Sequence, residues 1–293
     1  MLTLGDEGVS HVQAVKNIWN RVIEQHKAYK HLAKVHIELV QRMEKFDPVL
    51  PHKTIDEERA ARKFKQGIPF LEGQEDDLDL HYAILLCKEL CQWSGLGKAK
   101  SSFKKLLKLP DKNIEHLLRG WLKGDGTVMN QIASQYQIPL DVLHVFVRYS
   151  LLPTLHQYAK LFYEQRLFQH EEWLKEYCPV CGDQHGLAEF RGDEGFRHFR
   201  CLSCAADWVY WRLGCPYCQN RDHEQLFSLF IDDPQNKYQI DVCQKCNGYV
   251  KGLYKLDQST VPILLLDDFL TLHLDVLAEE KGYHRQQHMA QVH

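Results

Sequence analysis

Residues 199–218 read FRCLSCAADWVYWRLGCPYC and contain two Cys-x-x-Cys pairs separated by ten residues. A Cys-x-x-Cys turn places two sulfurs on one side of a tight loop. Two such loops facing each other supply the four sulfurs of a tetrahedral zinc or rubredoxin-type iron site. The fold therefore depends on whether these two pairs share one metal or belong to two sites.

The chain contains four Cys-x-x-Cys pairs, and an internal repeat indicates how they combine. The first unit runs CPVC, GLAEF, RGDEG, FRHFR, CLSC and DWVYW; the second runs CPYC, QLFSLF, IDDPQNK, YQID, CQKC and GYVKGLYKL. Each unit has the pattern of a loop, a hairpin, a loop and a strand. A hairpin brings its two ends together, so each unit predicts one site. The predicted ligand sets are Cys178, Cys181, Cys201 and Cys204, and Cys215, Cys218, Cys243 and Cys246.

The spacer between the two pairs supports this grouping. If residues 205–214 form a strand at about 3.3 Å per residue, they hold the flanking pairs roughly 30 Å apart, whereas metal–sulfur bonds are about 2.3 Å long. The stretch ADWVYWRL has no turn residue in its middle. Trp208 and Tyr210 on one face, with Val209 and Trp211 on the other, predict a strand buried between the two modules.

Other interpretations of the cysteines are less well supported. Dithiol redox catalysis requires an activated pair beside a thioredoxin-like βαβ pattern, which is missing, and disulfides require an oxidising compartment. His185, His198 and His223 could replace a thiolate, but each set already has four. The terminal HRQQHMAQVH is expected to be a frayed tail. Cys87 and Cys91 lie four residues apart on one helical face and are expected to be core residues.

The sequence before the cysteines is predicted to be helical, which gives an α+β fold. Amphipathic spacing and helix-boundary residues predict helices over 10–46 (ended by Asp47-Pro48), 55–65, 78–93, 100–108, 111–123, 127–136, 139–150 and from Pro153 almost to Cys178. A last helix is expected over 267–281. The predicted domains are an all-α domain over 1–172, a first metal-ribbon module over 173–214, and a second module with the C-terminal helix over 215–293. No Gly/Ser linker separates the parts, so they are expected to be docked.

Charge and motif content exclude several functions. Residues 171–293 carry 12 Lys and Arg against 19 Asp and Glu, and residues 1–170 carry 24 against 20. The cysteine-rich half is therefore acidic, which disfavours a nucleic-acid partner. No phosphate loop or nucleophile elbow is present, and closed four-thiolate sites leave no position for catalysis at the metal. The start lacks a leader pattern and VPILLL is too short to span a membrane, so a cytoplasmic protein without membrane insertion is expected.

The order of motifs resembles the formate dehydrogenase accessory protein family of FdhE type. The resemblance covers residues 177–284, through CPVCG, CLSC, CPYC, CQKC with GYVKGLY, and DD-x-x-x-L-x-L-D with EEKGY; FVRYSLLPTLHQYAKLF is the most family-like helical piece. It implies a cytoplasmic assembly factor, not an enzyme, with rubredoxin-like modules. Its eight paired cysteines would hold two zinc or iron ions. Its client would be the catalytic subunit of a respiratory formate dehydrogenase or a related molybdoenzyme.

Two departures concern the loops. Asn247 and Ala205 stand where the family commonly has glycine, and asparagine adopts positive φ more readily than alanine does. From the sequence alone, a zinc-ribbon nucleic-acid binder and a dithiol redox or sulfur-handling protein remain alternative functions. The sequence does not decide between zinc and iron, or whether the protein forms a homo-oligomer.

Overall fold

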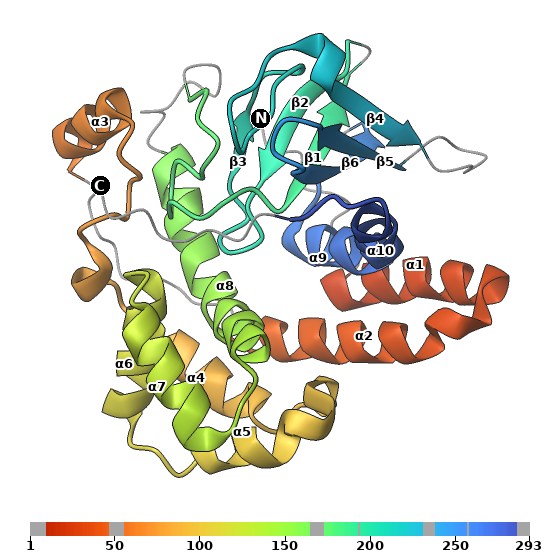
Figure 1. Cartoon of the computed structure of the whole chain (residues 1–293). Coiled ribbons are helices and arrows are strands. Elements are labelled where there is room, and N and C mark those ends of the chain that lie inside the picture. Colours follow the sequence, from red (N-terminus) through yellow and green to blue (C-terminus); the bar gives the residue numbers. More distant parts are fainter. Residues whose placement is uncertain are drawn as a thin grey trace.

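The structure, a computed structural model, describes residues 10–46, 56–164, 173–192, 194–230, 238–256 and 258–285. Helices form the first part and a sheet followed by helices forms the second, which confirms the α+β prediction (Figure 1). The helices before the sheet are α1 His11–Gln25, α2 Lys30–Glu44, α3 Glu57–Gln66, α4 His81–Leu90, α5 Lys100–Leu106, α6 Asp111–Leu122, α7 Gly126–Tyr136 and α8 Leu140–Glu164. Short 3-10 turns lie between them at η1 Lys27–Tyr29, η2 Glu75–Asp77 and η3 Ser94–Ala99.

Helices α3 to α7 lie within a few residues of their predicted bounds, because local signals set their ends. The carboxylate of Asp56 accepts a hydrogen bond from Arg59 N (2.9 Å) and starts α3. Gly67, at φ +73°, ends it. Asp125, in the predicted GDG break, caps α7 by accepting from Thr127 N (2.9 Å).

The predicted single helix over 10–46 is wrong. The chain leaves helical geometry at His26 (φ −136°) and turns back, so that α1 and α2 form an antiparallel pair. Val12 N donates to Glu44 Oε1 (3.0 Å), and Trp19 Nε1 donates to His36 Nδ1 (2.9 Å) inside the pair. The apolar spacing continues across this turn, so the sequence pattern did not indicate the break. The predicted stop at Asp47-Pro48 lies outside the described residues.

Helix α8 merges two predicted helices. It continues through Pro153, although proline has no N–H to donate to the carbonyl one turn earlier. Leu151, Leu152 and Leu155 around it are buried, and this packing outweighs a penalty of about 3 kcal/mol. The described part of α8 ends at Glu164, and residues 165–172 of the predicted helix lie outside the described residues.

Both cysteine units contribute to one six-stranded sheet of order β3-β2-β1-β6-β5-β4. The strands are β1 Leu187–Arg191, β2 Phe196–Arg200, β3 Asp207–Val209, β4 Leu226–Phe230, β5 Tyr238–Cys243 and β6 Tyr249–Lys255, with η4 His223–Gln225 before β4. Neighbours within a unit are antiparallel, and the units join through the parallel pair β1–β6. The sheet is therefore a fusion of two ribbons.

The strand predicted to lie between the modules lies at the edge of the sheet instead. β3 covers only Asp207–Val209 and pairs with β2 alone. Trp208 and Tyr210 are buried as expected, but Trp211 is 39% exposed, with Arg221 stacked over its ring. The seam between modules is the β1–β6 pair.

The C-terminal helix begins earlier than predicted and is broken. α9 spans Val261–Leu270, with Pro262 in its first turn, and α10 spans Leu272–Glu280. At the break, Thr271 Oγ1 donates to the Asp267 carbonyl (2.7 Å). Both helices lie beneath the sheet (Figure 1), and α10 packs Leu274 and Ala278 against β5.

The helical part is docked on the sheet part, as expected without a linker. One hydrophobic core runs through both, and Phe70 N and Leu71 N donate to the carbonyls of Pro179 and Val180 (2.8 Å each). The Tyr163 hydroxyl on α8 donates to the Asp207 carbonyl (2.7 Å) and accepts from Asp207 N (3.0 Å). Among the described residues, no single helix is long and apolar enough to cross a bilayer. Helices α7 and α8 meet those criteria only together, and the chain bends by 113° between them.

Candidate metal centres

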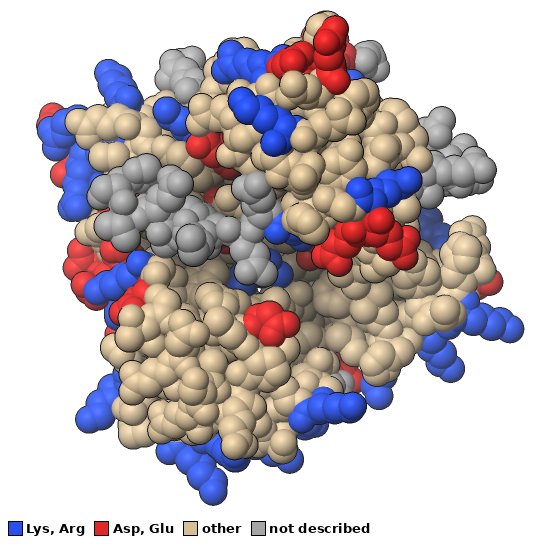
Figure 2. Space-filling model, viewed as in Figure 1, with Lys and Arg blue, Asp and Glu red and all other residues tan. Residues whose placement is uncertain are grey.

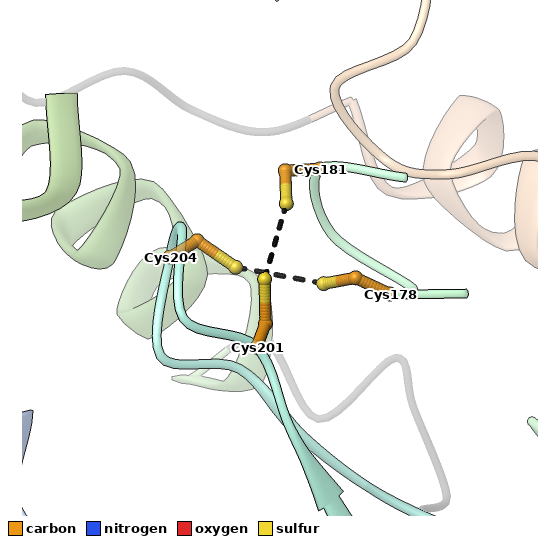
Figure 3. A group of neighbouring side chains, drawn as sticks. All are labelled: Cys178, Cys181, Cys201 and Cys204. Atoms are coloured by element: carbon orange, nitrogen blue, oxygen red, sulfur yellow. Dashed lines mark hydrogen bonds between the residues drawn. The ribbon is translucent and has the colours of Figure 1, made fainter. Parts of the chain in front are cut away.

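The first cysteine cluster has the predicted membership. Cys178, Cys181, Cys201 and Cys204 point toward one another from two loops (Figure 3). The Sγ atoms of Cys178 and Cys204 are 3.5 Å apart, and those of Cys181 and Cys201 are 3.6 Å apart. One loop precedes β1 and the other follows β2, so the hairpin brings them together.

The second cluster repeats this arrangement at the ends of β4 and β5. It contains Cys215, Cys218, Cys243 and Cys246. The Sγ distances are 3.5 Å between Cys215 and Cys246, and 3.7 Å between Cys218 and Cys243. The two pairs in residues 199–218 thus belong to different clusters, as the spacer predicted.

The sulfur geometry fits a tetrahedral metal ion. In each cluster the four sulfurs lie within 4.8 Å of one another. Four ligands at about 2.3 Å from one ion place neighbouring sulfurs about 3.8 Å apart, close to the observed spacing. A disulfide would hold two sulfurs about 2.05 Å apart, and all these cysteines are free. Zinc and iron both suit this donor set.

All four loops share one backbone design. The residue after each pair has positive φ: Gly182 (78°), Ala205 (60°), Gln219 (56°) and Asn247 (54°). In every loop the N–H of the first cysteine donates to the carbonyl five residues later, at 2.8 to 3.0 Å. Glycine fills the first of these turns, and Ala205 and Asn247 do occupy two of the others. The positive φ of Gln219 was not predicted from the sequence. Its position directly after a Cys-x-x-Cys pair could have indicated it.

The first cluster is the more enclosed of the two. Cys178, Cys201 and Cys204 are fully buried, and Val180 N and Ser203 N donate to cluster sulfurs at 3.4 Å. Burial raises the pKa of the Cys178 and Cys204 thiols. A buried thiolate therefore needs a nearby cation, which a metal ion supplies.

The second cluster is closer to solvent, since Cys218 and Cys246 are only partly buried. Asn220 Nδ2 donates to Cys243 Sγ at 3.8 Å. The second ion would thus be the more accessible to a chelator or a partner.

The three histidines considered as substitute ligands lie outside both clusters. His185 stacks on Phe199 with ring centroids 4.2 Å apart, and burial lowers its pKa to about 3. His198 lies 3.4 Å from Asp207, and His223 is exposed. Among the described residues, the two cysteine sets are the only groups with metal-ligand geometry. Cys87 and Cys91 are buried core residues, as predicted, while most of the terminal histidine segment lies outside the described residues.

Charged side chains of both signs lie on the face of the molecule shown in Figure 2. Figure 2 shows Lys and Arg scattered over one face and interspersed with Asp and Glu. Three buried basic side chains of the sheet are paired: Arg197 with Asp241, Arg200 with Glu189, and Lys251 with Asp268 and Asp275. A phosphate backbone requires uncompensated cations.

Known proteins share both the sequence pattern and the fold. A family model described as FdhE, C-terminal domain, matches residues 213–290, which include the second cluster. A curated protein named FdhE homolog from Aquifex aeolicus is 29% identical over 235 residues, covering 78% of this chain and 76% of that protein. Protein FdhE of Escherichia coli is 32% identical over 113 residues, covering 38% of this chain and 36% of that protein. The chain is therefore similar in sequence to FdhE proteins.

These similarities confirm the resemblance to FdhE proteins drawn from the cysteine loops. The crystal structure of the FdhE protein from Pseudomonas aeruginosa has a similar fold, with a TM-score of 0.66 over 96% of both chains and 20% identity. This likeness concerns the fold, in which an α-helical part is joined to a sheet.

Proposed function

We propose that this chain is a non-enzymatic assembly factor in the cytoplasm. It binds the catalytic subunit of a respiratory formate dehydrogenase, or a related molybdoenzyme, and supports its maturation. The observation that carries the proposal is the pair of closed four-cysteine clusters on one sheet in a chain similar to FdhE proteins. Four protein ligands leave no coordination position for a substrate, so the ions would shape a surface.

The proposed ligands are the eight clustered cysteines, with one zinc or iron ion in each set. When bound, the ion supplies the positive charge that keeps four thiolates together and ties each hairpin's ends. Several kcal/mol of folding free energy are expected from each closed site. The chain's own contribution is the backbone design that aims the four sulfurs of each set inward.

Co-purification tests the client. Tagged protein from a formate-respiring bacterium should recover a formate dehydrogenase catalytic subunit, identified by mass spectrometry. A variant carrying Cys178→Ser and Cys243→Ser should lose this partner, whereas Cys87→Ser, which changes a buried thiol outside both clusters, should keep it. Failure of the wild type to recover the subunit under several growth conditions would reject the client.

The same preparations test the other functions. Salt-sensitive retention on nucleic acid, or a reactive dithiol in thiol titration of the native protein, would support a nucleic-acid binder or a redox protein instead. We expect neither, because ligated thiolates react slowly and the buried cations of the sheet are paired with carboxylates.

Single substitutions test the assignment of ligands. Cys178→Ser should remove one metal ion per chain and leave the second cluster filled, while Cys243→Ser should do the reverse. Native mass spectrometry with metal analysis gives the stoichiometry, and Cys87→Ser serves as the matched control with both ions retained. Loss of both ions in either single variant would contradict two independent sites.

A further inference from the structure

The two cysteine units differ in how their closing loops are held. The closing loop of each unit contains its second Cys-x-x-Cys pair, and the two loops are residues 201–206 and 243–248. In the first unit, Arg200 Nη2 donates to the carbonyl of Ala205 (3.3 Å). Arg200 Nη1 also lies 3.0 Å from the carboxylate of Glu189 on β1. The first closing loop is therefore held by a side chain of its own unit.

The second unit has no such donor at the equivalent place. The residue before the first cysteine of the closing loop is Arg200 in the first unit and Val242 in the second, and a valine side chain cannot donate. The carbonyl of Asn247, at the equivalent position of the second closing loop, accepts from His284 N instead (2.7 Å). A parallel bridge also joins Gly248 to His284. The second closing loop is thus held from beyond the end of α10.

Residues 283–285 are fixed on both sides of this contact. Gly282, at φ +83°, turns the chain after α10. Arg285 Nη2 donates to the carbonyl of Gly186 (2.6 Å), directly before β1 in the first unit, and Arg285 Nη1 lies 3.9 Å from Asp268 Oδ1 on α9. The segment therefore crosses the second closing loop and is anchored in the first unit.

The loop that this segment holds belongs to the more open cluster. Cys246 in the second closing loop is only partly buried, whereas its counterpart Cys204 is fully buried. The bonds at Asn247 and Gly248 restrict the backbone directly after Cys246. Local opening of this backbone would move one of the four sulfurs away from the others, which is a first step in releasing an ion.

We infer that residues 283–285 form a clamp that keeps Cys246 in place and so retains the second ion. Arg285 is a positioning residue, because it holds His284 against Asn247 without touching the cluster. The effect on metal retention rests on the proposed ligand set of the second cluster and does not depend on the client. The first ion should not depend on the clamp, since Arg200 holds its closing loop.

Four variants test the clamp without changing a ligand. His284→Pro removes the N–H that donates to Asn247, and His284→Ala is the matched control that keeps it. Arg285→Ala removes the contacts to Gly186 and Asp268, and Arg285→Lys keeps a cation that can still donate to the Gly186 carbonyl. Far-UV circular dichroism should be unchanged in all four.

Native mass spectrometry during incubation with excess chelator measures the release of each ion. His284→Pro and Arg285→Ala should each release one ion at least about fivefold faster than the wild type, by loss of a hydrogen bond, and leave the other unchanged. His284→Ala should match the wild type, and Arg285→Lys should recover part of the loss. In Cys243→Ser, which should keep only the first ion, adding His284→Pro should have no effect.

Hydrogen exchange gives a second measurement that does not need the ion. Peptides covering residues 243–248 should exchange faster in His284→Pro than in His284→Ala, in both metal-loaded and metal-free protein. A chain that binds no ion in the second cluster would refute the ligand assignment, and exchange would still decide whether the clamp exists. Equal acceleration of both ions, or equal behaviour of the two His284 variants, would overturn the inference.

Discussion

Single residues set the geometry of the clusters. Each Cys-x-x-Cys loop ends in a positive-φ residue, and three of the four are not glycine. The left-handed conformation costs an L-residue about 1–2 kcal/mol, so Ala205, Gln219 and Asn247 are held there by the loop hydrogen bonds and, when present, the metal. Sequence spacing predicted which cysteines cluster, because this design is local to each loop.

Gly182→Ala tests the one loop in which glycine is required. Its φ of +78° is strained for alanine, and the added Cβ would lie 3.2 Å from Pro69 Cγ. We expect a loss of about 1–3 kcal/mol in the free energy of unfolding, measured by urea titration of the metal-loaded protein. Gly73→Ala is the control for φ alone, since Gly73 has φ +69° and no neighbour within 4 Å. Equal losses in both variants would show that the Pro69 contact contributes nothing.

His36 predicts a pH dependence of stability. Burial lowers its pKa from 6.5 to about 4 in the folded protein, where it accepts a hydrogen bond from Trp19 Nε1. His36 is therefore protonated at a higher pH in the unfolded chain than in the folded protein. His36 should cost no stability above pH 6.5 and progressively more as the pH falls toward 4, reaching at most about 3 kcal/mol.

The measurement for His36 is the free energy of unfolding at several pH values, compared between wild type and His36→Gln. Glutamine can still accept from Trp19, so the variant should show a shallower loss between pH 6.5 and 4. The metal content of both proteins should be followed, because thiolate protonation is common to both. Parallel pH profiles would contradict the prediction.

Elements were predictable where their signals were local. Caps and glycines predicted α3 to α7, and the repeat predicted both hairpins. The misassigned boundaries reflect tertiary packing: the turn at His26 interrupts an unbroken apolar spacing, and Pro153 lies inside α8 because both sides of it are buried. Likewise, no property of β1 or β6 alone indicates that they pair in parallel, so the shared sheet could not be predicted from the repeat.

The β1–β6 seam depends on Gly252. A Cβ at this position would lie 2.4 Å from the Phe190 ring and 3.3 Å from Gln239 Cγ, so the ring lies across the glycine. Gly252→Ala should destabilise the protein by about 1–3 kcal/mol through overpacking. Adding Phe190→Leu should recover part of that loss, measured as a double-mutant cycle in urea. Additive losses would show that the ring is not the obstacle.

At the scale of the whole molecule, the cysteine clusters and the helices share one core. The first cluster's Cys178, Cys201 and Cys204 belong to the same buried cluster as Leu155 and Phe162 of α8, and Tyr163 fixes α8 to β3. The shared core makes the two parts one rigid unit, which the proposed client-binding role would use. The ions should therefore stabilise helices that they do not touch.

Metal removal tests this coupling. Chelation of both ions should lower the melting midpoint of the far-UV helical signal by at least about 5 °C, because each closed site contributes several kcal/mol and the parts unfold together. Tyr163→Phe removes both bonds to Asp207 and should weaken the coupling, so that chelation shifts the helical signal less. Tyr158→Phe, which removes one bond to Asp79 N within the helical part, is the control. If the helical signal melted at the same temperature with and without metal, the two parts would be folding independently.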